Sequence, residues 1–273
     1  MTRRLPGRLV LLGHPVAHSL SPAFQNAALE AASIPIRYEA LDVAGHDFDR
    51  VVTSLRAEDT WGNVTVPYKE RMHDACDVVT PVAARASAVN TFWVDATGHL
   101  VGDNTDVGGF SAAVSALLGA SPRDLTVGVL GAGGTAAAVL TAVESWPGCE
   151  AHVYNRTPER ARLLCERFST IAQPIDDFGA AAGADLVVNA TSVGLHDGDV
   201  FPLDPALIAP SSAVLDIVYR RGETAWVRAA RAKGLRACDG IGMLVEQGAL
   251  AFERWFGVSP DRSVMREAVR LRQ

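Results

Sequence analysis

The segment Gly131-Ala-Gly-Gly-Thr-Ala136 constrains the fold of this chain more than any other stretch. It follows the apolar run 125–130, which predicts a short buried strand, and it precedes an alanine-rich run to about Glu144, which predicts a helix. This order of strand, glycine turn and helix is typical of a βαβ unit that binds a dinucleotide. The glycines permit a tight turn and let the pyrophosphate approach the backbone amides at the helix N-terminus. We therefore expect a dinucleotide-binding domain in the second half of the chain.

The end of the next predicted strand, 150–154, indicates which dinucleotide is bound. In an NAD site a carboxylate about 20 residues after the glycines binds the ribose 2′-hydroxyl. Here Asn155 and Arg156 follow the strand, with Arg160 one helical turn later. Because a planar guanidinium suits a 2′-phosphate, these residues favour NADP(H) over NAD(H). Thr157 and Pro158 also suit the start of a helix, so the segment can serve both purposes.

Length and periodicity predict an α/β protein with two domains, because 273 residues exceed the usual size of one core and strand and helix patterns alternate. Strands are expected at 8–13, 37–42, 62–66, 90–95, 99–101, 125–130, 150–154, 185–190 and 213–218. Helices are expected at 22–32, 107–118, 135–144, 243–256 and 261–271. We divide the chain into a substrate-binding domain (1–105), a Rossmann-like nucleotide domain (106–240) and two C-terminal helices (241–273). Segment 119–122 has the composition of a seam between domains.

Composition excludes several classes of function. The net charge of −6 and the lack of a basic stripe argue against a nucleic-acid partner. No apolar run approaches the ~20 residues that span a bilayer, and the apolar run near the N-terminus suits a first strand better than a signal peptide. The four cysteines have no C-x-x-C spacing and suggest reduced thiols in a cytoplasmic enzyme, with neither a disulfide framework nor a zinc site. We therefore expect an enzyme with a small-molecule substrate and no metal.

Two serines follow the first predicted strand. Ser21 suits the N-cap of the helix that continues with Pro22, whereas Ser19 has no evident structural role. Two hydroxyl groups beside a helix N-terminus form a good cradle for a carboxylate, because the helix dipole favours an anion there.

Lys69 stands where a lysine is electrostatically disfavoured. It follows the short segment Asn63-Val-Thr-Val-Pro67 and begins a helix, whose N-terminal end is already positive. A second polar segment, 102–106, carries Asp103, Thr105 and Asp106, which could cap the following helix. Each feature alone has a structural explanation, such as a solvated lysine or a polar turn. Their occurrence together ahead of a dinucleotide site indicates a substrate site.

With these motifs, the chain resembles the shikimate dehydrogenase family, which includes the related quinate/shikimate enzymes. The resemblance is carried by collinear segments over nearly the whole chain: Gly13-His-Pro-Val-Ala-His-Ser-Leu-Ser-Pro22, Asn63-Val-Thr-Val-Pro-Tyr-Lys69, Ala88-Val-Asn-Thr91, Gly102-Asp-Asn-Thr-Asp106, Gly131-Ala-Gly-Gly134, Asn155-Arg-Thr157, Asn189-Ala-Thr-Ser192 and Gly240-Ile-Gly-Met-Leu-Val-Glu-Gln247. It implies two α/β domains with the site in the cleft, and C-terminal helices that return to the substrate domain. The implied activity is the NADP-dependent, reversible reduction of 3-dehydroshikimate to shikimate, a step of chorismate and aromatic amino-acid biosynthesis, in a monomer or homodimer.

The resemblance also implies roles for individual residues. Lys69 and Asp106 would form the catalytic acid–base pair, and Ser19 and Ser21 would hold the substrate carboxylate. The remaining substrate residues would be Asn63, Thr65, Asn90, Asp106 and Gln247 at the ring hydroxyls, with Tyr219 near the nicotinamide. The cofactor residues would be Gly131, Ala132, Gly133, Gly134 and Thr135 at the pyrophosphate, Asn155, Arg156, Thr157 and Arg160 at the adenosine end, Thr191 and Ser192 along the cofactor, and Gly240 and Met243 near the nicotinamide.

The chain departs from the family pattern at His14, at Val107 and in the loop 194–200. These departures leave a quinate or aminoshikimate dehydrogenase open as an alternative, although an NAD-using quinate enzyme would be expected to carry an acid near Asn155. A non-catalytic NADP-binding regulator is a second alternative, but Lys69 and Asp106 are both present. A methylene-tetrahydrofolate dehydrogenase-like protein is a third, and the paired serines argue against it.

Overall fold

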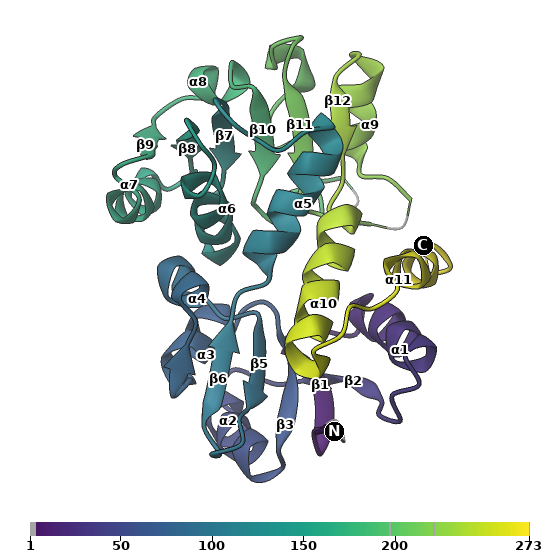
Figure 1. Cartoon of the computed structure of the whole chain (residues 1–273). Coiled ribbons are helices and arrows are strands. Elements are labelled where there is room, and N and C mark those ends of the chain that lie inside the picture. The colour runs from purple at the N-terminus through teal and green to yellow at the C-terminus, as the bar shows by residue number, and fades with distance from the viewer. Residues whose placement is uncertain (1–3, 197, 221, 273) are drawn as a thin grey trace. The chain divides into compact units, whose positions relative to one another are not determined.

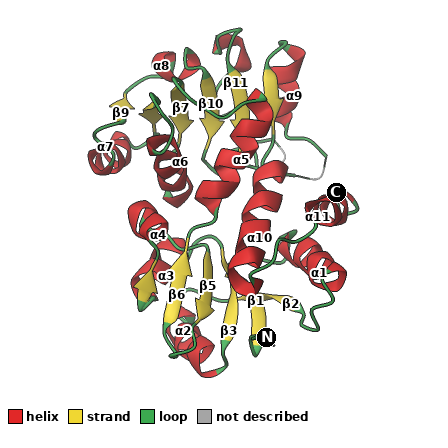
Figure 2. Cartoon of the chain, viewed as in Figure 1, coloured by secondary structure: helices red, strands yellow, loops and turns green. Residues whose placement is uncertain are grey.

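The computed structural model describes residues 4–196, 198–220 and 222–272, and the chain forms two compact units (Figure 1). Unit 1 consists of Met1–Gly109 and Leu244–Gln273, and unit 2 consists of Phe110–Met243. Each unit combines one sheet with helices (Figure 2). The predicted α/β class with two domains is confirmed, and so is the return of the C-terminal helices to the first domain. Because the chain enters unit 2 between Gly109 and Phe110, segment 119–122 lies inside that unit and is not a seam.

The sheet of unit 1 is mixed. Its strands lie in the order β2-β1-β3-β5-β6-β4, and β5 runs antiparallel to both β3 and β6. The bounds are β1 (Arg8–Gly13), β2 (Tyr38–Asp42), β3 (Thr60–Val64), β4 (Val78–Val79), β5 (Thr91–Val94) and β6 (Leu100–Asp103). The expected strand 62–66 begins and ends two residues earlier, at Thr60–Val64. Gly98 has the positive φ of +87° expected for the turn between β5 and β6.

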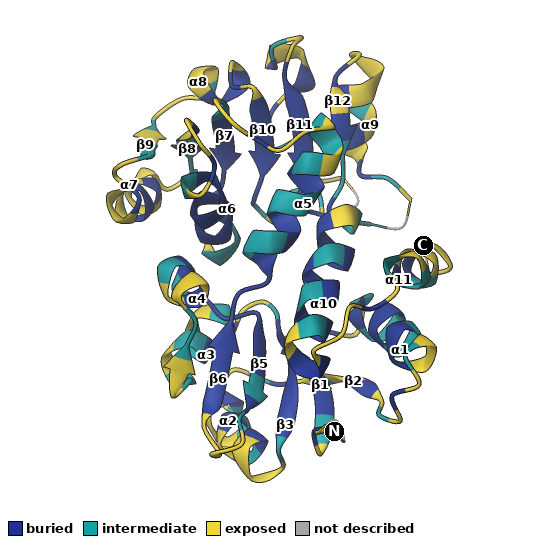
Figure 3. Ribbon diagram, in the orientation of Figure 1, coloured by how far each residue is buried: buried dark blue, intermediate teal, exposed yellow. Residues whose placement is uncertain are grey.

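Six helices belong wholly or largely to unit 1: α1 (Ser21–Ala31), α2 (Phe48–Ala57), α3 (Lys69–Ala75), α4 (Pro81–Ala86), α10 (Ile241–Phe256) and α11 (Arg262–Arg270). Helix α10 has buried positions along its length (Figure 3). Val245, Ala249 and Phe252 are completely buried, and their spacing is that of one helical face. Helix α11 packs along α1 and buries Met265 and Val269. These contacts hold the C-terminal segment in unit 1 and place Gln247 beside the polar residues of the first hundred positions.

Unit 2 has a parallel sheet of six strands in the order β12-β11-β10-β7-β8-β9. The strands are β7 (Thr126–Leu130), β8 (Glu150–Tyr154), β9 (Ala172–Ile175), β10 (Leu186–Asn189), β11 (Ala213–Asp216) and β12 (Arg236–Cys238). The helices are α5 (Asp106–Leu118), which begins in unit 1, and α6 (Gly134–Glu144), α7 (Pro158–Arg167), α8 (Gly179–Ala182) and α9 (Ala225–Ala232), with a 3₁₀ turn at Pro205–Leu207. The strand order reverses between β7 and β10, and ligands of such sheets bind at the carboxyl ends beside this switch point. The glycine turn after β7 lies at that place.

Within the residues that the structure describes, no helix is both long enough and apolar enough to cross a membrane.

Candidate active site

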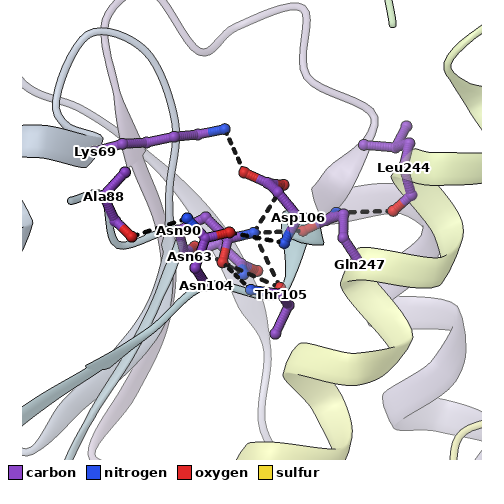
Figure 4. A network of polar contacts seen from close by, with 9 residues as sticks. All are labelled: Asn63, Lys69, Ala88, Asn90, Asn104, Thr105, Asp106, Leu244 and Gln247. Atoms are coloured by element: carbon purple, nitrogen blue, oxygen red, sulfur yellow. Dashed lines mark hydrogen bonds and ion pairs between the residues drawn. The ribbon is translucent and has the colours of Figure 1, made fainter. Parts of the chain in front are cut away.

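The pairing of three antiparallel strands gathers the polar residues of unit 1 at one edge of its sheet. Asn63 near the end of β3 pairs with Thr91 at the start of β5, and Thr91 pairs with Asp103 at the end of β6. Asn90, just before β5, therefore contacts both Asn63 and Asp106, which follows β6. Figure 4 shows the resulting network, in which α3 contributes Lys69 and α10 contributes Gln247.

Lys69 and Asp106 form an ion pair in this network. Lys69 is the first residue of α3, and its Nζ lies 2.7 Å from Oδ2 of Asp106, the first residue of α5. The Asp106 side chain is 8% exposed and the Lys69 side chain 18% exposed, so the pair is shielded but the lysine can be reached from solvent. The two residues that we expect to exchange a proton with the substrate thus lie together.

Asn90 connects this pair to the rest of the network. Its Nδ2 lies 2.9 Å from Asp106 Oδ1 and 3.2 Å from Gln247 Oε1, and its Oδ1 accepts the backbone amide of Thr105 at 2.7 Å. Each oxygen of Asp106 therefore has a donor, Lys69 on one side and Asn90 on the other. The carboxylate is held in one orientation.

Asn104, a residue that the sequence analysis did not single out, fixes the start of α5. Its Oδ1 accepts the amide of Asp106 at 3.1 Å, and its Nδ2 donates to the carbonyl of Ala88 at 2.8 Å. Asp103, Thr105 and Asp106 were the candidates for capping this helix, but the side chain that accepts the amide of Asp106 is that of Asn104. Asp103 is instead buried and accepts a hydrogen bond from Arg254 Nε of α10 at 2.7 Å. An asparagine two positions before a helical pattern is a capping signal that could have identified Asn104.

The two serines take different local roles from those expected. Leu20 is the N-cap of α1 and Ser21 is its first helical residue, so the prediction of Ser21 as N-cap is wrong. The Ser19 hydroxyl accepts the amide of Ser21 at 3.2 Å and thereby satisfies one of the donors that a helix N-terminus leaves open. Both serines follow β1, which is paired in parallel with β3. They are thus attached to the same sheet edge as Thr65, whose amide donates to Leu12.

The glycine turn of unit 2 lies between β7 and α6. Gly131 has a φ of +116°, and a Cβ there would lie 2.9 Å from the carbonyl oxygen of Ala190. Gly133 is the N-cap of α6, and a Cβ at Gly133 would meet none of the described atoms within 4 Å. Ala136 is fully buried, as close packing of α6 on the sheet requires. The space beside Gly133, at the start of α6, is thus open among the described residues.

The end of β8 carries two exposed arginines. Asn155 donates to the carbonyl of Thr157 at 2.9 Å, and Thr157 is the N-cap of α7, although its side chain makes no capping hydrogen bond. Arg156 and Arg160 are exposed, and neither forms an ion pair within the part of the chain that the structure describes. Unpaired guanidinium groups at this strand end suit a phosphate ester, and the sequence 155–157 offers no carboxylate to bind a ribose hydroxyl.

A buried aspartate organises the end of β10. Asn189 accepts hydrogen bonds from the hydroxyl of Thr191 at 2.7 Å and donates to Asp216 Oδ1 at 2.8 Å. Burial raises the pKa of Asp216, while hydrogen bonds from Thr224, Asn189 and Val218 oppose the shift. The carboxylate fixes Asn189 and, through it, the turn with Thr191 and the exposed Ser192. Neither Asp216 nor Asn189 was among the predicted site residues.

The last three predicted site residues also belong to unit 2. Gly240 is buried, and a Cβ there would lie 2.1 Å from the carbonyl oxygen of Ile217, so the position requires glycine. Met243 is buried and Tyr219 is half-buried. The other predicted substrate residues lie in unit 1, so Tyr219 is the member of that set that comes from the nucleotide unit.

Three segments of the chain match known families. Residues 11–92 match the shikimate dehydrogenase substrate binding domain, residues 115–196 match shikimate / quinate 5-dehydrogenase, and residues 240–270 match the shikimate 5′-dehydrogenase C-terminal domain. The three matches cover both units in the same order as the polar motifs.

Whole-length relatives agree with these matches. A shikimate dehydrogenase (NADP(+)) of Thermus thermophilus is 43% identical over 263 residues, which are 96% of this chain and 97% of that protein. Its namesake from Rubrobacter xylanophilus is 43% identical over 267 residues, 95% of this chain and 94% of that protein. The crystal structure of shikimate 5-dehydrogenase from Thermus thermophilus, in complex with NADP(H) and shikimate, matches with a TM-score of 0.89 and 42% identity over 97% of this chain and 99% of that chain. Since this similarity extends over nearly the full length of each chain, the protein belongs to the shikimate dehydrogenase family.

Proposed function

We propose that this protein catalyses the reversible, NADP-dependent reduction of 3-dehydroshikimate to shikimate. The observation that carries the proposal is the contact of 2.7 Å between Lys69 Nζ and Asp106 Oδ2 at the polar edge of the unit 1 sheet. Membership of the family and the named relatives, which are NADP-dependent shikimate dehydrogenases, agree with it.

The chemistry requires a proton donor beside the substrate carbonyl. The nicotinamide, when bound, supplies the hydride, and the carbonyl oxygen then gains negative charge. The ammonium group of Lys69 can donate a proton to that oxygen, and Asp106 holds the ammonium in one position. In the oxidative direction, neutral Lys69 would accept the proton of the substrate hydroxyl.

The same edge of the sheet suits a ring that carries several hydroxyl groups. Asn63, Thr65, Asn90 and Gln247 present amides and a hydroxyl group, which can donate to and accept from such a ring. Ser19 and Ser21 lie at the start of α1, where the helix dipole would favour the substrate carboxylate. We assign Tyr219 of unit 2 to the substrate as well.

The residues of unit 2 fit NADP. The backbone amides of Ala132, Gly133, Gly134 and Thr135 at the start of α6 would hold the pyrophosphate, and Arg156 and Arg160 would hold the 2′-phosphate with Asn155 and Thr157. Thr191, Ser192, Gly240 and Met243 would line the remaining length of the cofactor. Gly131 supports this fit, because its positive φ and its contact with Ala190 leave no room for a side chain in the turn.

One assay tests the proposal: initial rates of the purified protein with shikimate and with quinate, each with NADP⁺ and with NAD⁺. We expect the highest kcat/KM for shikimate with NADP⁺. Turnover of quinate in preference to shikimate, or a preference for NAD⁺, would replace this assignment by the quinate alternative, and no turnover of either substrate would contradict it. We further propose that the enzyme acts in the cytoplasm as a monomer or homodimer.

A further inference from the structure

Tyr38, the first residue of β2, is held rigidly beneath the polar edge of unit 1. It is 1% exposed, and its backbone amide and carbonyl both bond to the side chain of Asn26 at 2.9 Å. Its ring centroid lies 6.1 Å from that of Trp255 on α10. Because both the backbone and the ring are fixed, the direction of the phenol oxygen is fixed too. That oxygen donates to Asn63 Oδ1 at 2.8 Å.

The orientation of the Asn63 amide follows from its second contact. Asn63 Nδ2 lies 3.1 Å from the carbonyl oxygen of Asn90, which can only accept a hydrogen bond. The nitrogen of Asn63 must therefore face Asn90, and its oxygen must face Tyr38. Burial raises the pKa of the Tyr38 phenol well above its ordinary value, so the hydroxyl stays protonated and remains a donor.

These contacts form a chain from the core to the site. Tyr38 donates to Asn63, Asn63 donates to the backbone of Asn90, and the side chain of Asn90 donates to Asp106. Tyr38 itself is too deeply buried to reach a substrate. Among the residues that the structure describes, Asn63 Nδ2 donates to Asn90 alone, so its second N–H is open to a ligand.

We propose that Tyr38 is a positioning residue for the hydroxyl subsite: its phenol fixes the Asn63 amide so that the second N–H donates to the oxygen of a ring hydroxyl. This inference rests on the proposed function, since it takes shikimate as the ligand. The inference also gives the direction of the hydrogen bond at this subsite. Asn63 is the donor, and the ligand oxygen must have a free lone pair to accept.

Replacing Tyr38 with phenylalanine removes only the hydroxyl. We expect Tyr38→Phe to raise the KM for shikimate about five- to tenfold, the usual effect of one lost hydrogen bond, while kcat and the KM for NADP⁺ change less than about twofold. Tyr68→Phe is the matched control, because Tyr68 is 2% exposed and its hydroxyl donates to the backbone of Val43 instead of to Asn63. Both variants lose one buried hydrogen bond, so their melting temperatures should fall by similar amounts. Only Tyr38→Phe should change the KM for shikimate.

A double-mutant cycle separates positioning from general destabilisation. If Tyr38 acts through Asn63, then Tyr38→Phe should add no further rise in KM when it is combined with Asn63→Ala. The inference would be overturned if the two substitutions raised the KM for shikimate by factors that multiply in the double variant. It would also be overturned if Tyr38→Phe had the same KM as the wild type. Equilibrium titration with shikimate, at a temperature where circular dichroism shows each variant folded, makes the same comparison without turnover. Failure of the proposed function is distinguishable, because the wild-type protein itself would then not bind or oxidise shikimate.

Discussion

Lys69 and Asp106 are separated by 37 positions in the chain, and yet Nζ of the first and Oδ2 of the second are 2.7 Å apart. Each is the first residue of a helix, α3 and α5 respectively. The helix dipole favours a carboxylate at this position and disfavours an ammonium group, so Asp106 offsets an unfavourable placement of Lys69. A lysine held in this way is better explained by its use in chemistry than by its contribution to folding.

Asp106→Asn tests the role of the carboxylate. The Asp106 oxygen that faces Asn90 can be kept as the amide oxygen, but the other position then presents an NH₂ group to the Lys69 ammonium, so two donors face each other. We expect kcat to fall by about 10²-fold, with the KM for NADP⁺ unchanged, in steady-state kinetics. Asp49→Asn is the control, because Asp49 pairs with Arg71 at the surface and is 87% exposed. Equal rates for the two variants would show that the carboxylate at 106 has no catalytic role.

Arg156→Ala tests the assignment of the 2′-phosphate. Loss of a hydrogen bond between charged groups should raise the KM for NADPH roughly 10- to 100-fold and leave the KM for NADH nearly unchanged. Arg162→Ala is the control: it lies on α7, the helix that follows Arg156, and its guanidinium is 3.6 Å from Glu159, so neither value should change. An unaltered preference for NADPH over NADH in Arg156→Ala would exclude Arg156 from the phosphate site.

Gly131 and Gly133 of the turn should respond differently to replacement by alanine. Gly131→Ala places a side chain at a φ of +116° and against Ala190, so the free energy of unfolding should fall by about 1–3 kcal/mol in urea denaturation. Gly133 has a φ of −103°, which alanine adopts readily, and a Cβ there meets open space. Gly133→Ala should therefore keep the stability of the wild type and raise the KM for NADPH, because the new methyl group occupies the approach of the pyrophosphate. A Gly133→Ala variant with unchanged KM would place the pyrophosphate elsewhere.

The cysteines should be unreactive in the folded protein. Burial raises the pKa of Cys76 to about 12 and those of Cys165 and Cys238 to about 11, and it also raises the pKa of Cys149. Because the thiolate is the reactive form, a thiol with a pKa three units above the solution pH has roughly 0.1% in that form. Ellman's reagent at pH 8 should thus modify none of the four within minutes, and all of them in denaturant. Rapid labelling of one thiol in the native protein would contradict this prediction and would show that the cysteine is accessible as the thiolate.

The elements that carry function followed from local patterns. The bounds of β1 and β8 agree with the sequence prediction, because each is a short apolar run with a clear turn at its end. The glycine turn and the lysine at the start of α3 were likewise predicted. Ser21 was wrongly predicted as the N-cap because it directly precedes Pro22. The hydroxyl that accepts the first helical amide belongs instead to Ser19, two residues before the start of the helix.

Residues that act through distant partners were not predicted. Tyr38 meets Asn63 across 25 positions, and Asp103 meets Arg254 across 151 positions. Only the pairing of the strands and the return of α10 bring these groups together, and no local pattern contains that information. Helix α4 was also missed, since a segment of six residues carries too few helical turns to show a period.

The most direct test of the account is the kinetic effect of Lys69→Ala on shikimate oxidation by NADP⁺. If Lys69 exchanges the proton of the substrate hydroxyl, kcat should fall by about 10²- to 10⁴-fold, with a much smaller change in the KM for shikimate. Circular dichroism of the same sample verifies that the variant is folded. A folded Lys69→Ala protein that retained most of the wild-type kcat would contradict the account.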